Sequence, residues 1–288
     1  MTQIYLDPTK KHDAILLFDC LDGNPNGDPD AGNQPRTDPQ TNQGLVTDAC
    51  LKRKVRNYIQ MLAPDEQEPE RFKIFIKSGS VLNNTLKEAY DASETKKIKR
   101  DKKSVETVSG WIVQNYYDVR MFGAVMSTGD YQAGQVWGPV QISFSRSIDP
   151  VFPQSFCITR CAATVEDENK DNKTIGRKEA IPYGLYRSHV FYNPSLASHV
   201  TERDLELLWE SLVKSWEFDR SASRGFMACR GLYILSHANK YGSAPVHQLF
   251  DRLQVEAISK VPRSFSDYRV EFSGILPDGV TLTRLGLD

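Results

Sequence analysis

A basic cluster follows a long polar loop, and its chemistry is that of a phosphate-binding surface. Lys52 and Arg56 are four residues apart, with Arg53 between them. In a helix, side chains with this spacing are neighbours whose Cβ atoms lie about 5–6 Å apart. Lysine and arginine bind phosphate oxygens, and such contacts supply most of the sequence-independent affinity for nucleic acids. The cluster therefore predicts contact with a polynucleotide backbone, although a solvated basic helix face has the same composition.

A helix positions these cations. Leu51, Val55 and Ile59 recur with the spacing of one helical face, so this side is expected to pack inward. Thr47 and Asp48 are residue types that cap helix starts. The caps would fix the entrance of the helix and leave the cations on its exposed side.

The loop before the helix has two interpretations. From Asp22 to Asp28, oxygen-bearing residues alternate and a glycine is sixth, as in the first half of an EF-hand calcium loop. The twelfth residue is Asn33 where a glutamate is needed, and a predicted strand precedes the loop instead of a helix. A stiff loop of Asx turns, shaped by Asn24 and Asn26, explains the composition better, and calcium is the alternative. Arg36 adds a cation to this loop.

Composition restricts the function classes. The chain has 288 residues and a net charge of −1, which argues against general electrostatic attraction to nucleic acid. Contacts with RNA must therefore come from local patches. The cysteines form no C-x-x-C pair and are odd in number, so we expect no zinc site, no disulfide framework and no cofactor; they are Cys20, Cys50, Cys157, Cys161 and Cys229. A reducing cytoplasm is the expected compartment, without a signal peptide or membrane span.

The pattern of hydrophobic residues predicts a mixed α+β chain. Strands are expected at 14–20, 72–76, 140–144, 185–192, 232–237, 268–272 and 280–285, and helices at 51–62, 80–90, 107–117 and 205–216. Thr201 to Asp204 resembles a capping box at the start of the last helix. Without two charged insertions the order is strand, helix, strand, strand, helix, strand, the ferredoxin-like βαββαβ unit.

The strand at 140–144 is expected to bury one face. Val140, Ile142 and Phe144 alternate with polar residues that include Gln141. The polar face would be crossed by an RNA backbone or be simply solvated. The octapeptide of RNA-recognition domains does not occur, so stacking of bases on sheet aromatics is not expected. Bases of a bound strand would stay free.

Two charged segments flank this strand. Six cations surround one acid in Lys96–Lys103, which is either a solvated segment or a contact with nucleic acid. Residues 157–182 read as a long hairpin with a charged tip at 166–173. Further on, Arg224 precedes Gly225, a residue that permits close backbone approach.

Several motifs together carry a family resemblance. The run LLFDCLDGNPNGDPDAGNQPRTDPQTNQGLVTDACLKRKVRNY resembles the N-terminal signature of the Cas-seven backbone subunits of type I-C CRISPR Cascade, in the RAMP superfamily. Further matches follow in family order: VRMFGAVMS at 119–127, WGPVQISFSRSIDPV at 137–151, IGRKEAIPYGLYRSHVFYNP at 175–194 and SRGFMACRGLY at 223–233.

The resemblance implies a fold and a function. The fold would be a modified RRM-like palm at 1–62, 139–147 and 184–288, with a fingers insertion at 63–138 and a thumb hairpin at 148–183. The subunit would be a scaffold without catalytic activity. Copies of it would form a helical filament along guide RNA, together with other Cascade subunits, and present bases to the target DNA strand.

The resemblance also assigns residues. The thumb would insert between bases, with Ile175 as the wedge, and Arg224 with Gly225 would form a second RNA-contacting loop. The complete set of expected RNA contacts is Asn24, Asn26, Arg36, Thr47, Lys52, Arg53, Arg56, Gln141, Ile175, Arg177, Arg224 and Gly225.

An alternative is a guide-processing endonuclease of the same superfamily. Metal-free RNA cleavage needs a general base near the 2′-hydroxyl and a cation for the phosphate. His189, Tyr186 and Arg187 are the compact cluster of such residues. In a strand His189 would face the same way as Arg187 and opposite to Tyr186, and a structural histidine is the simpler interpretation.

Overall fold

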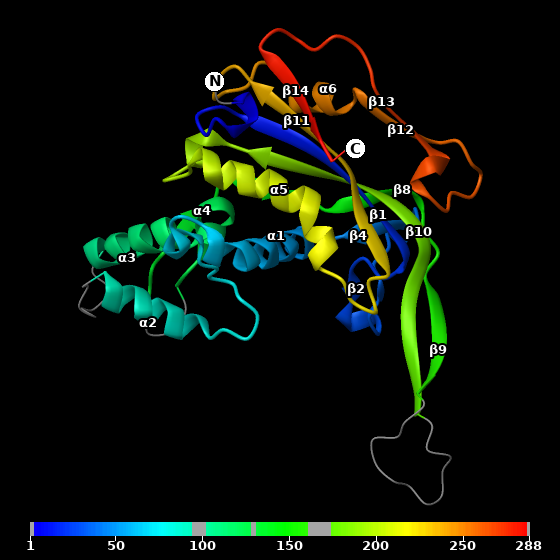
Figure 1. The fold of residues 1–288 in the computed structure, drawn as a ribbon, viewed down its shortest axis with the longest axis horizontal. Helices are drawn as coiled ribbons and strands as arrows, with labels where there is room; N and C mark the ends of the chain where they lie inside the picture. The colour runs from blue at the N-terminus through cyan, green and yellow to red at the C-terminus, as the bar shows by residue number, and fades with distance from the viewer. Residues whose placement is uncertain (1–2, 94–101, 128–130, 161–173, 287–288) are drawn as a thin grey trace, which may run out of the picture.

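A computed structural model describes residues 3–93, 102–127, 131–160 and 174–286 (Figure 1). Its centre is an antiparallel sheet with the strand order β14-β11-β1-β10-β8-β4, in which β7 and β9 also pair with β10. The strands of this sheet are β1 (His12–Gly23), β4 (Gln43–Val46), β7 (Val140–Ile142), β8 (Ser145–Pro150), β9 (Gln154–Arg160), β10 (Thr174–Tyr192), β11 (Phe226–His237) and β14 (Val280–Leu285).

Both faces of β1 are buried, which explains why its sequence is almost continuously apolar. Ala14, Leu16 and Phe18 point to a core shared with α1 (Asp48–Leu62) and α5 (Glu202–Phe218). The alternate residues, such as Ile15 and Leu17, pack on the other face. That face is covered by α6 (Val246–Phe250) and the hairpin of β12 (Leu253–Ala257) and β13 (Tyr268–Phe272).

A separate hydrophobic core lies beside the sheet. It is built from the segment between Phe75 and Val136. Its elements are α2 (Leu82–Ala92), α3 (Lys102–Asn115), α4 (Tyr117–Phe122), β5 (Gly123–Val125) and β6 (Gln135–Trp137). The remaining short elements are β2 (Gly27–Asp28), β3 (Gln34–Pro35) and 3₁₀ turns at Ile4–Leu6, Pro29–Ala31, Ala63–Asp65, Pro69–Phe72, Pro194–Leu196 and Phe265–Asp267.

Most predicted elements are present. The strands predicted at 14–20, 185–192, 232–237, 268–272 and 280–285 are confirmed and lie in β1, β10, β11, β13 and β14. The hairpin of β9 with β10 is also confirmed. The capping box is also confirmed, since Thr201 Oγ1 accepts from the amide of Asp204 and the Asp204 carboxylate accepts from the amide of Thr201. No helix in the described part of the chain is long and apolar enough to cross a membrane.

Two predictions about strands were wrong. Residues 72–76 form no strand, because the amides of Phe75 and Ile76 donate to the buried carboxylate of Asp118 at 2.8 and 3.0 Å. Phe144 is 55% exposed, whereas Ser145 is buried. The chain leaves β7 after Ile142 and enters β8 at Ser145, and this break shifts the alternation of side chains by one residue.

Candidate nucleic-acid interface

The loop after β1 and the loop before β11 are locked together by their backbones. A Cβ atom on Gly23 would collide with the carbonyl of Arg224, and one on Gly225 would collide with the carbonyl of Leu21. Gly225 has a φ of 62°, in the left-handed region that favours glycine. The amide of Asn24 also donates to the carbonyl of Ser223 at 2.8 Å. The backbone at Gly225 therefore lies close to the loop after β1, and the two loops form one surface.

The first loop is tied to the start of α1. Asn26 Oδ1 accepts from the amide and the hydroxyl of Thr47 at 2.9 and 3.0 Å. The Thr47 hydroxyl in turn accepts from the amide of Cys50 as the N-cap of α1. Asn24 is buried and donates to the carbonyl of Asn33 at 2.7 Å. Both asparagines therefore shape the loop, as expected.

Two of the candidate calcium ligands in this loop, Asn26 and Asp28, already have hydrogen-bond partners. Asn26 Oδ1 is occupied by Thr47, and one carboxylate oxygen of Asp28 accepts from Arg36 at 3.2 Å. Within the described ranges, no group of three His, Cys, Asp or Glu side chains is placed to hold a metal ion. The side chain of Arg36 is 31% exposed and lies at the surface beside its acid partner.

The cations of α1 do not share one exposed face. Lys52 pairs with Asp48 at 3.0 Å and keeps part of its side chain exposed. Arg53 donates to the carbonyl of Ile76 at 3.2 Å and is also half-buried. Both side chains are therefore only partly exposed, and each already has a partner within the fold.

The prediction that Arg56 is exposed was wrong. Its Nε donates to Asp118 at 2.8 Å, and both side chains are buried. The guanidinium also lies 5.5 Å from the centre of the Phe122 ring. Because α4 carries both partners, it covers this side of α1 and separates Arg56 from solvent.

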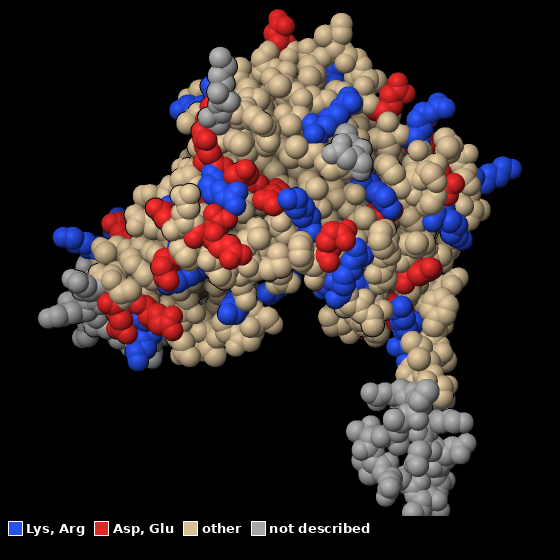
Figure 2. Space-filling model, in the orientation of Figure 1, with Lys and Arg blue, Asp and Glu red and all other residues tan. Residues whose placement is uncertain are grey.

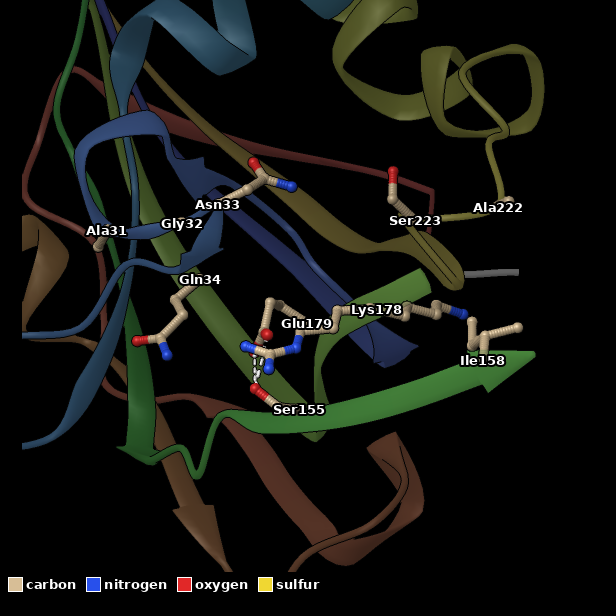
Figure 3. A pocket seen from close by; sticks show the side chains of 11 residues that line it. Ala31, Gly32, Asn33, Gln34, Ser155, Ile158, Lys178, Glu179, Ala222 and Ser223 are labelled. Carbon is tan, nitrogen blue, oxygen red and sulfur yellow. Dashed lines mark hydrogen bonds between the residues drawn. The ribbon is translucent and has the colours of Figure 1, made fainter. Parts of the chain in front are cut away.

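A groove opens beside the joined loops (Figure 3). It measures about 480 Å³, and its lining comes from three segments far apart in sequence: residues 31–34, the hairpin residues Ser155, Ile158 and Arg177–Glu179, and residues 222–223. Arg177 is exposed at this groove. The carboxylate of Glu179 accepts from the Ser155 hydroxyl at 2.6 Å across the hairpin. The groove thus combines cations, amides and hydroxyls, the groups that bind phosphate and sugar oxygens.

On a larger scale, the hairpin and the helical lobe enclose a hollow. Figure 2 shows it between the lobe of α2 and α3 and the projecting hairpin, with both basic and acidic side chains around its rim. Gln141 is exposed on β7, outside the groove, and its amide donates to the carbonyl of Gly138.

Three expected features fall partly or wholly outside the described residues. The backbone of Ile175 pairs with Thr159, but its side chain is not described. The charged tip at 166–173 is also outside, as are residues 96–101 of the Lys96–Lys103 run. Lys102 and Lys103 begin α3.

The cluster proposed for cleavage does not converge. Tyr186 lies in the core and stacks on Phe18, with ring centres 5.3 Å apart. Arg187 and His189 lie on the opposite face of β10, as predicted, where His189 stacks on Phe250 at 4.5 Å and Arg187 donates to two carbonyls. Burial, with the nearby Arg187 charge, lowers the pKa of His189 to about 4. This geometry is that of a structural histidine.

Sequence reasoning missed an ionic cluster behind the interface. The Asp219 carboxylate forms ion pairs with both Lys54 of α1 and Arg224 of the loop before β11. Lys54 is only 3% exposed. A signal was available, since Lys54 is three residues from Leu51 and one from Val55, positions that lie on the apolar face of the helix.

Comparisons with known proteins identify the family. The model of a family described as "CRISPR-associated protein Cas7" matches residues 10–273. A relative with that name from Haloferax volcanii is 26% identical over 234 residues, which cover 70% of this chain and 64% of the relative, less than two thirds of its length. A solved chain of a "CRISPR RNA-guided surveillance complex, pre-nicking" shares the fold with a TM-score of 0.50 and 13% identity, covering 82% of this chain and 79% of that one. Because the family model spans most of the sequence, this chain belongs to the Cas7 family of CRISPR-associated proteins.

Proposed function

We propose that this chain is a non-catalytic backbone subunit of a type I-C CRISPR surveillance complex. It binds guide RNA through phosphate contacts and leaves the bases free to pair with a target DNA strand. The observation that carries the proposal is the convergence of the loop after β1, the loop before β11 and the β9–β10 hairpin around one polar groove. Family membership supplies the context for this surface.

The RNA contacts are divided between two groups of residues. Lys52, Arg53, Arg177 and Arg224 keep side chains near solvent and contact phosphates directly. A second group supports them, with Asn24, Asn26 and Thr47 fixing the loop and its junction with α1. Arg56 acts from behind through its pair with Asp118. Arg36, Gln141, Ile175 and Gly225 complete the proposed set.

The fold is proposed to be a modified RRM-like palm with fingers and a thumb. The order β11-β1-β10-β8, with α1 after β1 and α5 after β10, supports a ferredoxin-like palm. The separate core of residues 75–136 supports fingers at 63–138, and the projecting β9–β10 hairpin supports a thumb at 148–183 (Figure 1). The palm then comprises residues 1–62, 139–147 and 184–288.

The proposed partners follow from this role. Several copies line up along one guide RNA as a helical filament, other Cascade subunits complete the complex, and the assembly works in the cytoplasm. The net charge of −1 supports binding by local patches and a contribution from neighbouring copies.

RNA of increasing length tests the proposal. Purified protein is mixed with unrelated single-stranded RNAs, and the number of bound copies is measured by analytical ultracentrifugation. We expect the number to grow in proportion to RNA length and to be independent of sequence. Recognition of one short motif alone, or specific cleavage of precursor RNA, would contradict the proposal.

A paired substitution tests the surface. Lys52→Ala with Arg53→Ala should lower RNA affinity and reduce the salt dependence by roughly 0.7 in log–log slope for each phosphate that is no longer neutralised. The control is Lys214→Ala with Lys260→Ala, which removes the same charge from positions away from the start of α1. Equal decreases in affinity for both pairs would remove the start of α1 from the interface.

A further inference from the structure

The carboxylate of Asp219 joins cations from two elements. Asp219 follows α5, and its amide donates to the carbonyl of Ser215 at 3.0 Å as the C-cap. One carboxylate oxygen accepts from Nζ of Lys54 in α1, and the other accepts from Nη1 of Arg224. The same nitrogen of Arg224 donates to the backbone carbonyl of Asp219 at 3.2 Å. The acid is therefore a bridge between α1 and the loop before β11.

Burial increases steeply across this cluster. The side chains of Arg224, Asp219 and Lys54 are 31%, 11% and 3% exposed. Nζ of Lys54 also lies 4.9 Å from the centre of the Trp216 ring. A buried ammonium next to an aromatic ring has little freedom to move, because any displacement would leave its charge unpaired. Lys54 thus fixes the carboxylate, and the carboxylate fixes the guanidinium.

The backbone of Arg224 is fixed as well. Its carbonyl accepts from Sγ of Cys20 at 3.6 Å and lies against Gly23 so closely that no Cβ fits there. In the described part of the chain, the hydrogen bonds of the guanidinium use Nη1 alone. The other nitrogens of a part-exposed guanidinium are available to a phosphate, which arginine binds with two parallel N–H groups.

We infer that Asp219 is a positioning residue for nucleic-acid binding: it holds the guanidinium of Arg224 in the orientation that meets a phosphate. Lys54 supplies the counter-charge, so the three side chains keep a net charge of +1 and the carboxylate does not repel the RNA. A preorganised side chain loses less conformational entropy on binding than a mobile one. This inference rests on the proposed RNA-binding function.

The simplest variant is not sufficient. Asp219→Asn leaves the buried Lys54 without its counter-ion, which strongly destabilises a protein. The better test is the double variant Lys54→Met, Asp219→Val, because it removes the acceptor of Arg224, and replacing both members of a buried pair with apolar residues of similar volume is often tolerated. The control is Glu217→Gln. Glu217 is two residues before Asp219 and forms an exposed ion pair with Arg220, so this variant removes a nearby negative charge without affecting the buried cluster.

The measurement is the affinity of the full chain for a single-stranded oligoribonucleotide of mixed sequence, as a function of salt. The double variant should bind about tenfold more weakly, the order of one charge-assisted hydrogen bond. Its salt slope should become shallower by roughly 0.7, the value of one phosphate contact. Glu217→Gln should keep the wild-type affinity. Adding Arg224→Ala to the double variant should weaken binding little further, because Arg224 no longer meets the phosphate in the double variant.

Three results would overturn the inference. Affinity that rises in the double variant would show that Asp219 only neutralises Arg224. Unchanged affinity with a lower thermal midpoint would show a purely structural role. Full additivity with Arg224→Ala would show that the two residues act separately. A wild-type chain that binds no RNA would instead refute the proposed function, so the two failures are distinguishable.

Discussion

At the scale of single residues, buried ion pairs connect elements that are far apart in sequence. Arg120 of α4 and Asp204 of α5 are both buried, with Nη2 and Oδ1 2.6 Å apart. Asp204 also accepts from Arg71 at 2.9 Å. Asp118 joins α1, α4 and the amides at 75–76 in the same way. Removal of one partner from such a pair typically costs about 3–5 kcal/mol, because the other charge stays buried.

The Arg120 pair gives a first prediction. Arg120→Met should lower the free energy of unfolding by about 3–5 kcal/mol, since Asp204 would remain in the interior without its main counter-charge. Arg203→Met is the matched control, because Arg203 is 40% exposed and pairs with Glu66 and Glu206 near the surface. Its cost should be at most about 1 kcal/mol. Urea unfolding measures both, and equal costs would contradict the argument.

A buried histidine makes stability depend on pH. His12 is fully buried, its Nε2 lies 2.9 Å from the carbonyl of Asp7, and its Nδ1 lies 3.0 Å from the hydroxyl of Ser236. A carbonyl can only accept, so Nε2 carries the proton and Nδ1 accepts from the serine. This neutral form is complete in the fold. Burial lowers the pKa of His12 to about 4.

The sign of the pH effect follows from this shift. The pKa of a histidine in an unfolded chain is about 6.5. Between pH 6.5 and pH 4, the unfolded state therefore binds more protons at His12 than the folded state does. The free energy of unfolding should therefore fall as pH drops from 6.5 towards 4, by up to about 1 kcal/mol per pH unit from His12. His12→Asn should show a shallower slope in urea unfolding between about pH 5 and 7. An unchanged slope would contradict the assignment.

At the scale of elements, local sequence patterns predicted what local interactions determine. The capping box at Thr201 and the start of α1 at Thr47 were found because both use residues three positions apart. The ion-pair partners of Arg56 and Lys54 could not be predicted in the same way, since they are 62 and 165 residues away. The missing strand at 72–76 has the same cause, a carboxylate 42 residues further along the chain.

The cap of α5 supports a further stability prediction. Thr201→Ala removes the hydroxyl that accepts from the amide of Asp204 and donates to its carboxylate at 2.9 Å. Removal of such a cap costs about 0.5–2 kcal/mol. Thr107→Ala is the control, because the hydroxyl of this exposed threonine donates to the carbonyl of Lys103 within α3 and caps no helix end. Calorimetry should show a lower thermal midpoint for Thr201→Ala and little change for the control.

At the scale of the whole molecule, the hairpin stands apart from the cores that stabilise the fold. The sheet has a hydrophobic core on each face, and a separate core serves the helical lobe. No described residue between Gln154 and Lys178 belongs to any of these cores. Phe156 and Ile158 are each 47% exposed on the projecting hairpin (Figure 1). Apolar side chains in that position are typical of a surface that meets a partner.

Shortening the hairpin should therefore separate folding from assembly. Replacing residues 156–178 with a short Gly-Ser turn removes Arg177 from the groove but leaves all three cores intact. The free energy of unfolding should change little, because no described residue of the removed segment belongs to a hydrophobic core, whereas binding to long RNA should weaken and lose its proportionality to length. Phe156→Ser keeps the hairpin, Arg177 and the lining of the groove, so it should retain binding to short RNA and lose only assembly on long RNA. If the shortened chain unfolds, or if it still assembles on long RNA like the wild type, the hairpin does not have the separate role that its position predicts.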